Sequence, residues 1–187
     1  MGALRDELLA GVRGRVVEIG AGNGMNFRHY PSTTTEVVAV EPEPHLRQLA
    51  GRAAGEVSVQ VTVLPGTAED LPLETASADV GVVCLMLCAL DDQRAALAEL
   101  HRVLRPGGEL RFLEHVVADT ATLRAVQRLA DATVWPLLTG GCRTARDPVA
   151  AMEGVGFTVE RTRRLRFPDS AIPVPGAPHV LGFARRP

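Results

Sequence analysis

Strand-like and helix-like segments alternate along this chain, and that alternation constrains its fold more than any other feature. Short apolar runs that stop at turn residues predict buried strands at 15–20, 36–42, 57–64, the first part of 78–90, and 109–116. Amphipathic or capped segments between them predict helices at 44–53, 91–108, 121–135 and 147–156. Two further strands, 157–167 and 179–186, follow as an antiparallel pair around a proline-rich loop at 167–178.

Strands separated by helices form a mostly parallel sheet that is covered on both faces. The sequence therefore predicts an α/β fold: one doubly wound, Rossmann-like sheet of seven strands, mostly parallel, with an antiparallel hairpin at its C-terminal end. A length of 187 residues is most simply one domain, residues 1–187. Ligands of such sheets bind outside the carboxyl ends of the strands.

Composition excludes several classes of function. A net charge of -2 and the lack of interleaved basic and aromatic residues argue against nucleic-acid binding. Three cysteines, without a CxxC pair, argue against a disulfide framework and fit a reducing, cytoplasmic setting. The first residues have no apolar segment long enough for a signal peptide or membrane span. The five histidines are scattered without the spacing of metal ligands, so no metal site is expected.

The glycine-rich turn after the first strand indicates what the protein binds. Gly20, Gly22 and Gly24 have the spacing GxGxG, whereas the dinucleotide fingerprint is GxGxxG. Glu18 precedes the first glycine by two residues; its carboxylate would repel a pyrophosphate but can face an ammonium group. A ligand with an amino-acid end is therefore favoured over a dinucleotide.

Two further elements extend this ligand. Glu41 ends the second strand about twenty residues past the glycines, where a ribose-binding carboxylate belongs. The segment 66–72, "GTAEDLP", follows the third strand and can offer backbone amides and polar side chains to an adenine edge. An ammonium, a ribose and an adenine together describe S-adenosylmethionine.

With these elements the chain resembles the class I S-adenosylmethionine-dependent methyltransferases over nearly its whole length. The glycine-rich turn, Glu41, "DVGVV" at 79–83 and "LRPGG" at 104–108 correspond to motifs of that class. The resemblance implies S-adenosylmethionine as cofactor. The predicted cofactor site comprises Glu18, Gly20, Ala21, Gly22, Gly24, Asn26, Glu41, Pro42, Thr67, Ala68, Glu69, Cys84 and Leu85.

Within that class the chain is most similar to the methyltransferase-like thiol methyltransferases. The matching stretches are "NF" at 26–27, "YP" at 30–31, "LC" at 87–88, "RVLRPGG" at 102–108, "EH" at 114–115, "GC" at 141–142 with Thr144 nearby, and "PH" at 178–179. Animal relatives begin with an apolar membrane anchor that this sequence lacks, so a soluble protein is expected. Thr67 stands where many relatives have aspartate. Few residues precede the first strand, so the pocket is either open or completed by another chain, for instance in a homodimer.

The acceptor side is less specific. A thiol needs the least activation, because a few per cent of it is thiolate at neutral pH, whereas a hydroxyl needs a base. His115 is the candidate catalytic base, with a purely structural histidine as the alternative; Glu114 points to the opposite face of a regular strand. Met86, Trp135, Arg143 and His179 are candidate substrate residues. Packing accounts equally well for Trp135, whereas a surface position is favoured for Arg143 and a structural role for His179. Cys88 and Cys84 read as packing residues.

The predicted function is methyl transfer from S-adenosylmethionine to a small-molecule acceptor, with a thiol as the leading candidate. One alternative is an O- or C-methyltransferase acting on a quinol or natural product. Another is a protein that binds S-adenosylmethionine without catalysis. A dinucleotide oxidoreductase is disfavoured by the GxGxG spacing and by Glu18.

Overall fold

The computed structural model describes residues 1–169 and 174–187, so part of the predicted loop at 167–178 lies outside the described residues. In chain order the elements are α1 (Gly2–Leu9), β1 (Gly14–Ile19), η1 (Phe27–His29), β2 (Thr34–Val40), α2 (Pro44–Ala54), β3 (Val61–Leu64), β4 (Ala78–Cys84), η2 (Leu87–Ala89), α3 (Gln93–Val103), β5 (Leu104–His115), α4 (Ala121–Asp131), α5 (Trp135–Leu138), α6 (Pro148–Gly154), β6 (Thr158–Arg166) and β7 (Pro178–Arg185).

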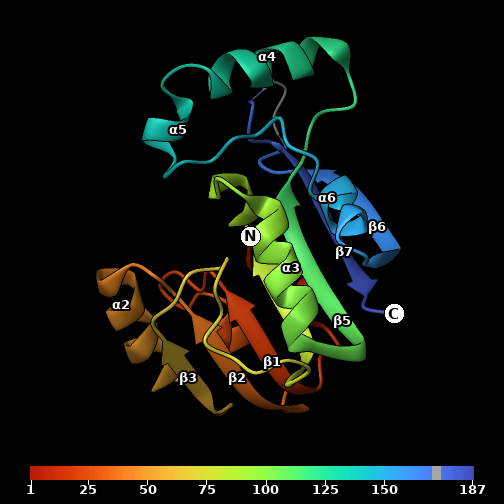
Figure 1. Cartoon of the computed structure of the whole chain (residues 1–187). Coiled ribbons are helices and arrows are strands. Elements are labelled where there is room, and N and C mark those ends of the chain that lie inside the picture. Colours follow the sequence, from red (N-terminus) through yellow and green to blue (C-terminus); the bar gives the residue numbers. More distant parts are fainter. Residues whose placement is uncertain (170–173) are drawn as a thin grey trace.

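The strands form one seven-stranded sheet in the order β3-β2-β1-β4-β5-β7-β6. Strands β1 to β5 pair in parallel, and β7 lies antiparallel between β5 and β6. The predicted fold class is therefore confirmed, including the antiparallel C-terminal pair (Figure 1). Strand order reverses at β1 and β4, which puts the glycine-rich turn at the switch point of the sheet.

Apolar side chains on the two faces of the sheet form two cores. One contains Leu97 and Leu100 of α3 and Met152 of α6, and the other contains Leu8 and Leu9 of α1 with the apolar residues of β1 and β2 that face them. Alternation along β1 explains the division, because Val16 faces one core and Val17 the other. The sheet is thus covered on both sides, as the buried strands require.

Several predicted boundaries were wrong, and each has a local cause. Helix α1 was not predicted; it is short, and only its last two residues are buried. Strand β3 begins at Val61 rather than at 57. Helix α3 ends at Val103, because the proline in "LRPGG" cannot continue a helix, and the following residues enter β5. The predicted helix 121–135 ends at Asp131, and a separate helix α5 begins around its own N-terminal proline.

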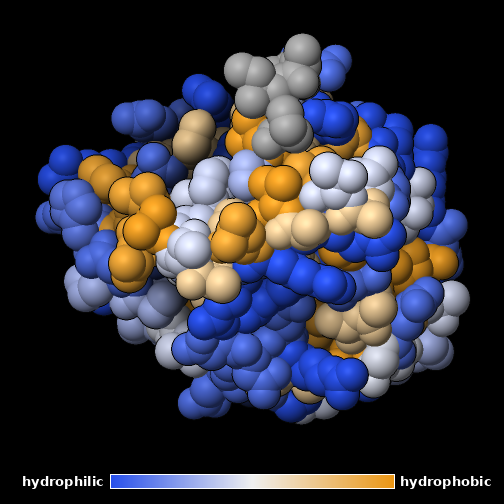
Figure 2. All heavy atoms as spheres, turned by 90° about the horizontal axis from the view of Figure 1, so that it is seen from above, coloured by the Kyte–Doolittle hydropathy of each residue, from blue (hydrophilic) through white to orange (hydrophobic). Residues whose placement is uncertain are grey.

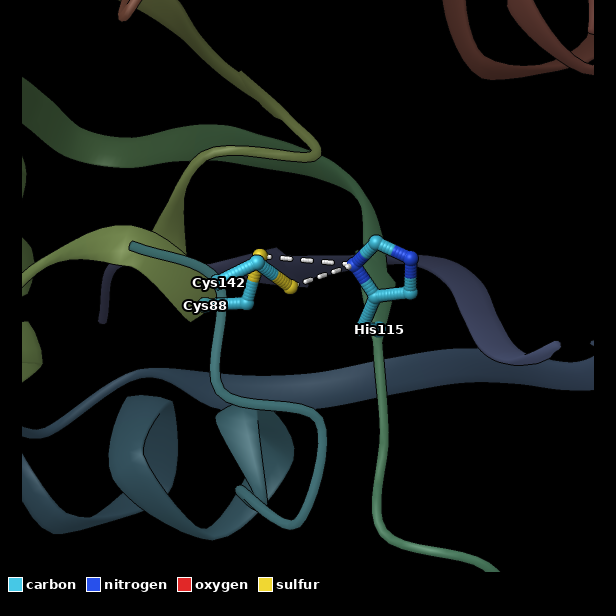
Figure 3. Close-up of side chains that lie close together, drawn as sticks. All are labelled: Cys88, His115 and Cys142. Carbon is cyan, nitrogen blue, oxygen red and sulfur yellow. Dashed lines mark hydrogen bonds between the residues drawn. The ribbon is translucent and has the colours of Figure 1, made fainter. Parts of the chain in front are cut away.

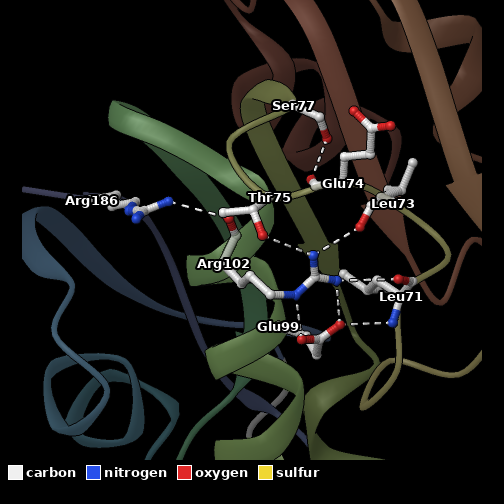
Figure 4. Close-up of polar contacts among 8 residues, drawn as sticks. All are labelled: Leu71, Leu73, Glu74, Thr75, Ser77, Glu99, Arg102 and Arg186. Atoms are coloured by element: carbon white, nitrogen blue, oxygen red, sulfur yellow. Dashed lines mark hydrogen bonds and ion pairs between the residues drawn. The ribbon is translucent and has the colours of Figure 1, made fainter.

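Arg102 ties the loop between β3 and β4 to helix α3. Its guanidinium donates to the carbonyl oxygens of Leu71 and Leu73 and pairs with Glu99 on the same helix (Figure 4). The Glu99 carboxylate also accepts the backbone N–H of Leu71 at 2.9 Å. This network holds the end of the predicted adenine segment at Leu71 and the loop that follows it.

Helices α4 and α5 lie beyond the carboxyl end of β5 (Figure 1). They expose an unusual number of large apolar side chains, and Figure 2 shows hydrophobic residues gathered on this face of the molecule. Among the described residues of α4, α5 and the turn between them, the exposed apolar side chains are Val126, Leu129, Val134, Leu137 and Leu138. In the part of the chain that the structure describes, no helix has the length and apolarity needed to cross a membrane.

Candidate active site

The glycine-rich turn runs back across the end of β2. The N–H groups of Gly20 and Ala21 donate to the carbonyl oxygen of Val40 at 2.9 and 3.3 Å. The N–H of Gly22 donates to the Glu41 carboxylate at 2.7 Å, and Glu43 N–H donates to its other oxygen at 3.1 Å. All three glycines have positive φ, which explains why glycine is needed here. At Gly22 a Cβ atom would meet nothing within 4 Å, so the backbone leaves open space at this point.

That open space belongs to a small polar cavity of about 190 Å³ at the end of β1. Seven of the thirteen predicted cofactor residues line it: Glu18, Gly20, Ala21, Gly22, Asn26, Cys84 and Leu85. Glu41 reaches its margin through the hydrogen bond to Gly22, and Gly24 packs on Phe27 beside the turn. Pro42, Thr67, Ala68 and Glu69 do not line this cavity, and Thr67 is exposed.

Glu18 lines the cavity and is almost completely buried: only 2 % of the residue's surface is exposed. Its two oxygens accept hydrogen bonds from Asn26 Nδ2 at 2.9 Å and from the Tyr30 hydroxyl at 2.6 Å. Burial raises the pKa of Glu18 to about 7, although the two hydrogen bonds and the charge of Arg5 act in the opposite direction. Burial therefore disfavours the charged form of this carboxyl group, which a cationic ligand group in the cavity would stabilise.

Arg5 also lines this cavity, and the sequence analysis did not identify it. Its Nε donates to Asn26 Oδ1 at 3.1 Å, whereas its Nη1 is buried and has no hydrogen-bond partner in the described structure. A buried guanidinium nitrogen without a partner is costly, so this position suits an anionic ligand group. No signal in the sequence marked this position, because helix α1, which carries Arg5, was not predicted.

The next loop begins the acceptor side. Met86 packs against the glycine-rich turn, since a Cβ atom on Gly20 would lie 2.9 Å from Met86 Cβ. Glu114 of β5 accepts the N–H groups of Met86 and Leu87 at 3.0 and 3.2 Å. It is fully buried, and burial raises its pKa to about 7. Glu114 therefore holds this loop in place, while the neighbouring His115 points elsewhere, as strand alternation predicts.

The other candidate acceptor residues divide into two groups. His115 and His179 are cross-strand partners with ring centroids 4.5 Å apart, and a Cβ atom on Gly176 would touch both Trp135 and His115. His179 is buried, donates to the Ala177 carbonyl at 2.8 Å, and has a pKa lowered to about 4 by burial. The Arg143 side chain is exposed and forms an ion pair with Asp91 at 3.3 Å.

Cys88 and Cys142 meet at His115, a convergence that their positions in the sequence do not reveal. Both sulfur atoms face His115 Nδ1, at 3.3 Å from Cys88 Sγ and 3.4 Å from Cys142 Sγ (Figure 3). The hydrogen bond from Cys88, together with His115, lowers the pKa of the Cys142 thiol to about 5, and the pKa of Cys88 is raised in turn. Cys88, His115 and Cys142 thus form one coupled group at the end of β5.

Comparison with known proteins shows which family this chain belongs to. A profile described as a methyltransferase domain matches residues 17–112. Thiol S-methyltransferase TMT1A of Homo sapiens is 31% identical over 180 residues, which cover 94% of this chain and 72% of the relative. The ubiquinone/menaquinone biosynthesis C-methyltransferase UbiE of Rubrivivax gelatinosus is 32% identical over 154 residues, which cover 82% of this chain and 57% of the UbiE chain. The structure of a geranyl diphosphate methyltransferase in complex with SAM has the same fold, with a TM-score of 0.75 and 16% identity over 99% of this chain and 84% of that one.

The protein is therefore a class I S-adenosylmethionine-dependent methyltransferase, and S-adenosylmethionine is its cofactor. The chain belongs to the methyltransferase-domain family, whose profile covers the strands and turns that build the cavity described above.

Proposed function

We propose that this protein transfers a methyl group from S-adenosylmethionine to the thiol of a small molecule, and that residues 1–187 act as one methyltransferase domain. The similarity to a thiol S-methyltransferase over 94% of the chain is the observation that carries this proposal. At 94% of the chain, the match extends beyond the cofactor half into α4 and β6, on the side where the acceptor is proposed to bind.

In this proposal the small polar cavity binds the amino-acid end of the methyl donor. Glu18 binds the ammonium group and the free Nη1 of Arg5 binds the carboxylate, so each charge finds the opposite sign. The turn at Gly22 lets the backbone approach the ligand, and Glu41 retains lone pairs that can accept from ribose hydroxyls. Thr67, Ala68 and Glu69 would border the adenine from the next strand end.

The protein then contributes chiefly positioning. The bound donor supplies an electrophilic methyl group, and the chain must align an acceptor sulfur with it and exclude water. Leu85 lines the donor cavity and Met86 packs on its glycine-rich turn, and both directly precede η2, whose Cys88 contacts His115. An acceptor held beside His115, His179 and Trp135 would therefore lie next to the loop that borders the donor. His115 stands beside this acceptor position and is the proposed base for the thiol proton.

C-methylation of a quinol is the second candidate, favoured by the similarity to the UbiE enzyme. The exposed apolar side chains of α4 and α5 would suit a hydrophobic acceptor equally well.

We further infer a reducing, cytoplasmic location from the odd number of cysteines, all of them free thiols. A homodimer that completes the acceptor pocket stays a prediction.

The test is release of S-adenosylhomocysteine from purified protein and S-adenosylmethionine, with an alkyl thiol, a phenol, a quinol or no acceptor. Release only with the thiol would support the proposal. Release only with the quinol would replace the thiol by the second candidate. Donor binding without release in any reaction would contradict both and favour a non-catalytic binding protein.

A further inference from the structure

The cluster of Cys88, His115 and Cys142 comes from three separate parts of the chain. Cys88 belongs to η2 after β4, His115 is the last residue of β5, and Cys142 lies in the segment between α5 and α6. Their three potential ligand atoms lie within 4.8 Å of one another. Among residues 1–169 and 174–187, these three side chains form a cluster close enough to hold a metal ion. Both cysteines are buried, at 3 % and 5 % exposure, whereas His115 is partly exposed.

The backbone around the cluster is fixed independently of the three side chains. The N–H of Arg143 donates to the carbonyl oxygen of Cys88 at 2.8 Å, which joins the two cysteine segments directly. Asp131 accepts the N–H groups of Thr144 and Ala145 at 2.8 and 2.9 Å. The cysteine positions are therefore set by hydrogen bonds to the main chain around them, so a ligand would meet a largely preformed site.

The distances agree with the needs of a metal ion. Zinc binds Cys sulfur at about 2.3 Å and His nitrogen at about 2.0 Å in a tetrahedral arrangement. Tetrahedral angles with those bond lengths put sulfur and nitrogen roughly 3.5 Å apart, and the two observed separations are 3.3 and 3.4 Å. We propose that Cys88, His115 and Cys142 form a binding site for a thiophilic divalent cation such as Zn²⁺.

Two cysteines and one histidine leave the fourth position of a tetrahedral ion free, the pattern of catalytic rather than structural zinc sites. With a metal ion on its ring, His115 would act as a ligand and not as the base. A small-molecule thiol could occupy the fourth position: its S–H proton leaves to solvent as the sulfur–metal bond forms, and no redox change occurs. Coordination holds the sulfur as thiolate at neutral pH. After methylation the sulfur is a neutral thioether, a weaker ligand that departs. This role rests on the proposed thiol methylation, whereas metal binding itself does not.

Metal binding is tested on the untagged chain of residues 1–187, purified with a reductant and treated with a chelator. Zn²⁺ affinity is measured by competition with a chromophoric chelator, and Co²⁺ binding by its sulfur-to-metal charge-transfer absorption. We expect one ion per chain for the wild type and for Cys84→Ser, the matched control, because Cys84 lies outside the cluster. Cys88→Ser, Cys142→Ser and His115→Gln should each lose at least about a hundredfold in affinity.

The Co²⁺ spectrum of the wild type requires no variant, so it remains decisive even if a variant folds poorly. Absence of the charge-transfer absorption, or equal loss of affinity in Cys84→Ser, would overturn the site. A disulfide between Cys88 and Cys142 that persists in reductant would overturn it as well.

Activity separates this inference from the proposed function. With donor binding intact, restoring Zn²⁺ to the chelated protein should raise thiol methylation at least about tenfold. A metal-free protein that methylates the thiol at full rate would overturn the coordination role and leave the proposed function standing. Tight metal binding without thiol methylation at any metal content would overturn the proposed function and leave the site.

Discussion

Glu18 is a buried carboxyl group whose protonation is coupled to both stability and ligand binding. Because burial raises its pKa from 4.5 to about 7, the unfolded chain releases this proton first as the pH rises. Glu18 therefore contributes stability that is fully present below pH 4.5 and is lost as the pH rises through about 7. A ligand ammonium group would restore the charged form to a favourable environment.

We predict that Glu18→Gln gains stability over the wild type as the pH rises from 4.5 to about 7, by up to about 3 kcal/mol. The same variant should bind S-adenosylhomocysteine at least about tenfold more weakly above pH 7, because it lacks the charge. Urea unfolding at several pH values and calorimetric titration measure the two effects. Parallel stability profiles for the two proteins would refute the assigned pKa.

Arg5 gives a prediction about the opposite end of the same ligand group. Arg5→Met should weaken S-adenosylhomocysteine binding by about 10- to 100-fold, since a charge-assisted hydrogen bond is lost. Binding of 5′-methylthioadenosine, which has no amino-acid end, should not change. Arg13→Met, at an exposed position in the loop before β1, is the control. Equal weakening of both ligands would show that Arg5 supports the fold and not the carboxylate.

Gly22 and Gly107 form a matched pair for testing the turn. Both have positive φ, 57° and 78°, and neither has an atom within 4 Å of an added Cβ. Leucine at either position should cost about 1–2 kcal/mol of stability for the left-handed backbone. Only Gly22→Leu should abolish cofactor binding, because only its side chain would occupy the ligand cavity. Normal binding by Gly22→Leu, measured by calorimetry, would contradict the position of the donor.

At the scale of elements, helix α4 depends on one buried polar side chain. Gln127 accepts the N–H of Ala118 at 2.8 Å, and its amide nitrogen faces the carbonyl oxygens of Val116, Thr144 and Pro175 at 3.0 to 3.2 Å. It is the buried residue of this helix, which otherwise lies half or fully exposed. The helix thus connects the end of β5 with the segments that carry Cys142 and His179.

We predict that Gln127→Leu lowers the free energy of unfolding by about 2–4 kcal/mol, because buried main-chain groups lose their partners. Hydrogen exchange should accelerate at residues 116–118 and 142–146 more than in β1 or β4. Arg128→Leu, on the exposed side of the same helix, should change stability by less than about 0.5 kcal/mol. Similar values for the two variants would show that α4 is held in another way.

At the scale of the whole molecule, ligand binding should stabilise the fold through mass action. Saturating S-adenosylhomocysteine at about 100 times its Kd adds about 2.7 kcal/mol, which raises the Tm of a domain this size by roughly 5–10 °C. NADH at the same concentration should leave the Tm unchanged, since Glu18 faces the position of a pyrophosphate. A scan of Tm against each ligand checks both expectations, and stabilisation by NADH would contradict the ligand class.

The sheet and most of the donor cavity could be predicted because their signals are local. A strand, a glycine turn and an acid at a strand end lie within a few residues, and Glu18, Gly22 and Asn26 do line one cavity. Arg5, Gln127 and the meeting of Cys88 with Cys142 could not be predicted. Their positions depend on how α1 and α4 pack against distant strands, and a single sequence has no periodic signal for that.

The attachment of α4 has a thermal consequence. Release of apolar surface gives protein unfolding its large heat-capacity change and its cooperativity. Helix α4 buries a glutamine and little else, so its detachment would expose few apolar groups that water does not already reach. Helix α4 should therefore loosen gradually on warming, with a small heat-capacity change, while the two apolar cores keep the sheet intact to a higher temperature. Because Asp131 at the end of α4 holds the segment that carries Cys142, the same loosening should open the cysteine cluster at temperatures where the donor cavity is still rigid.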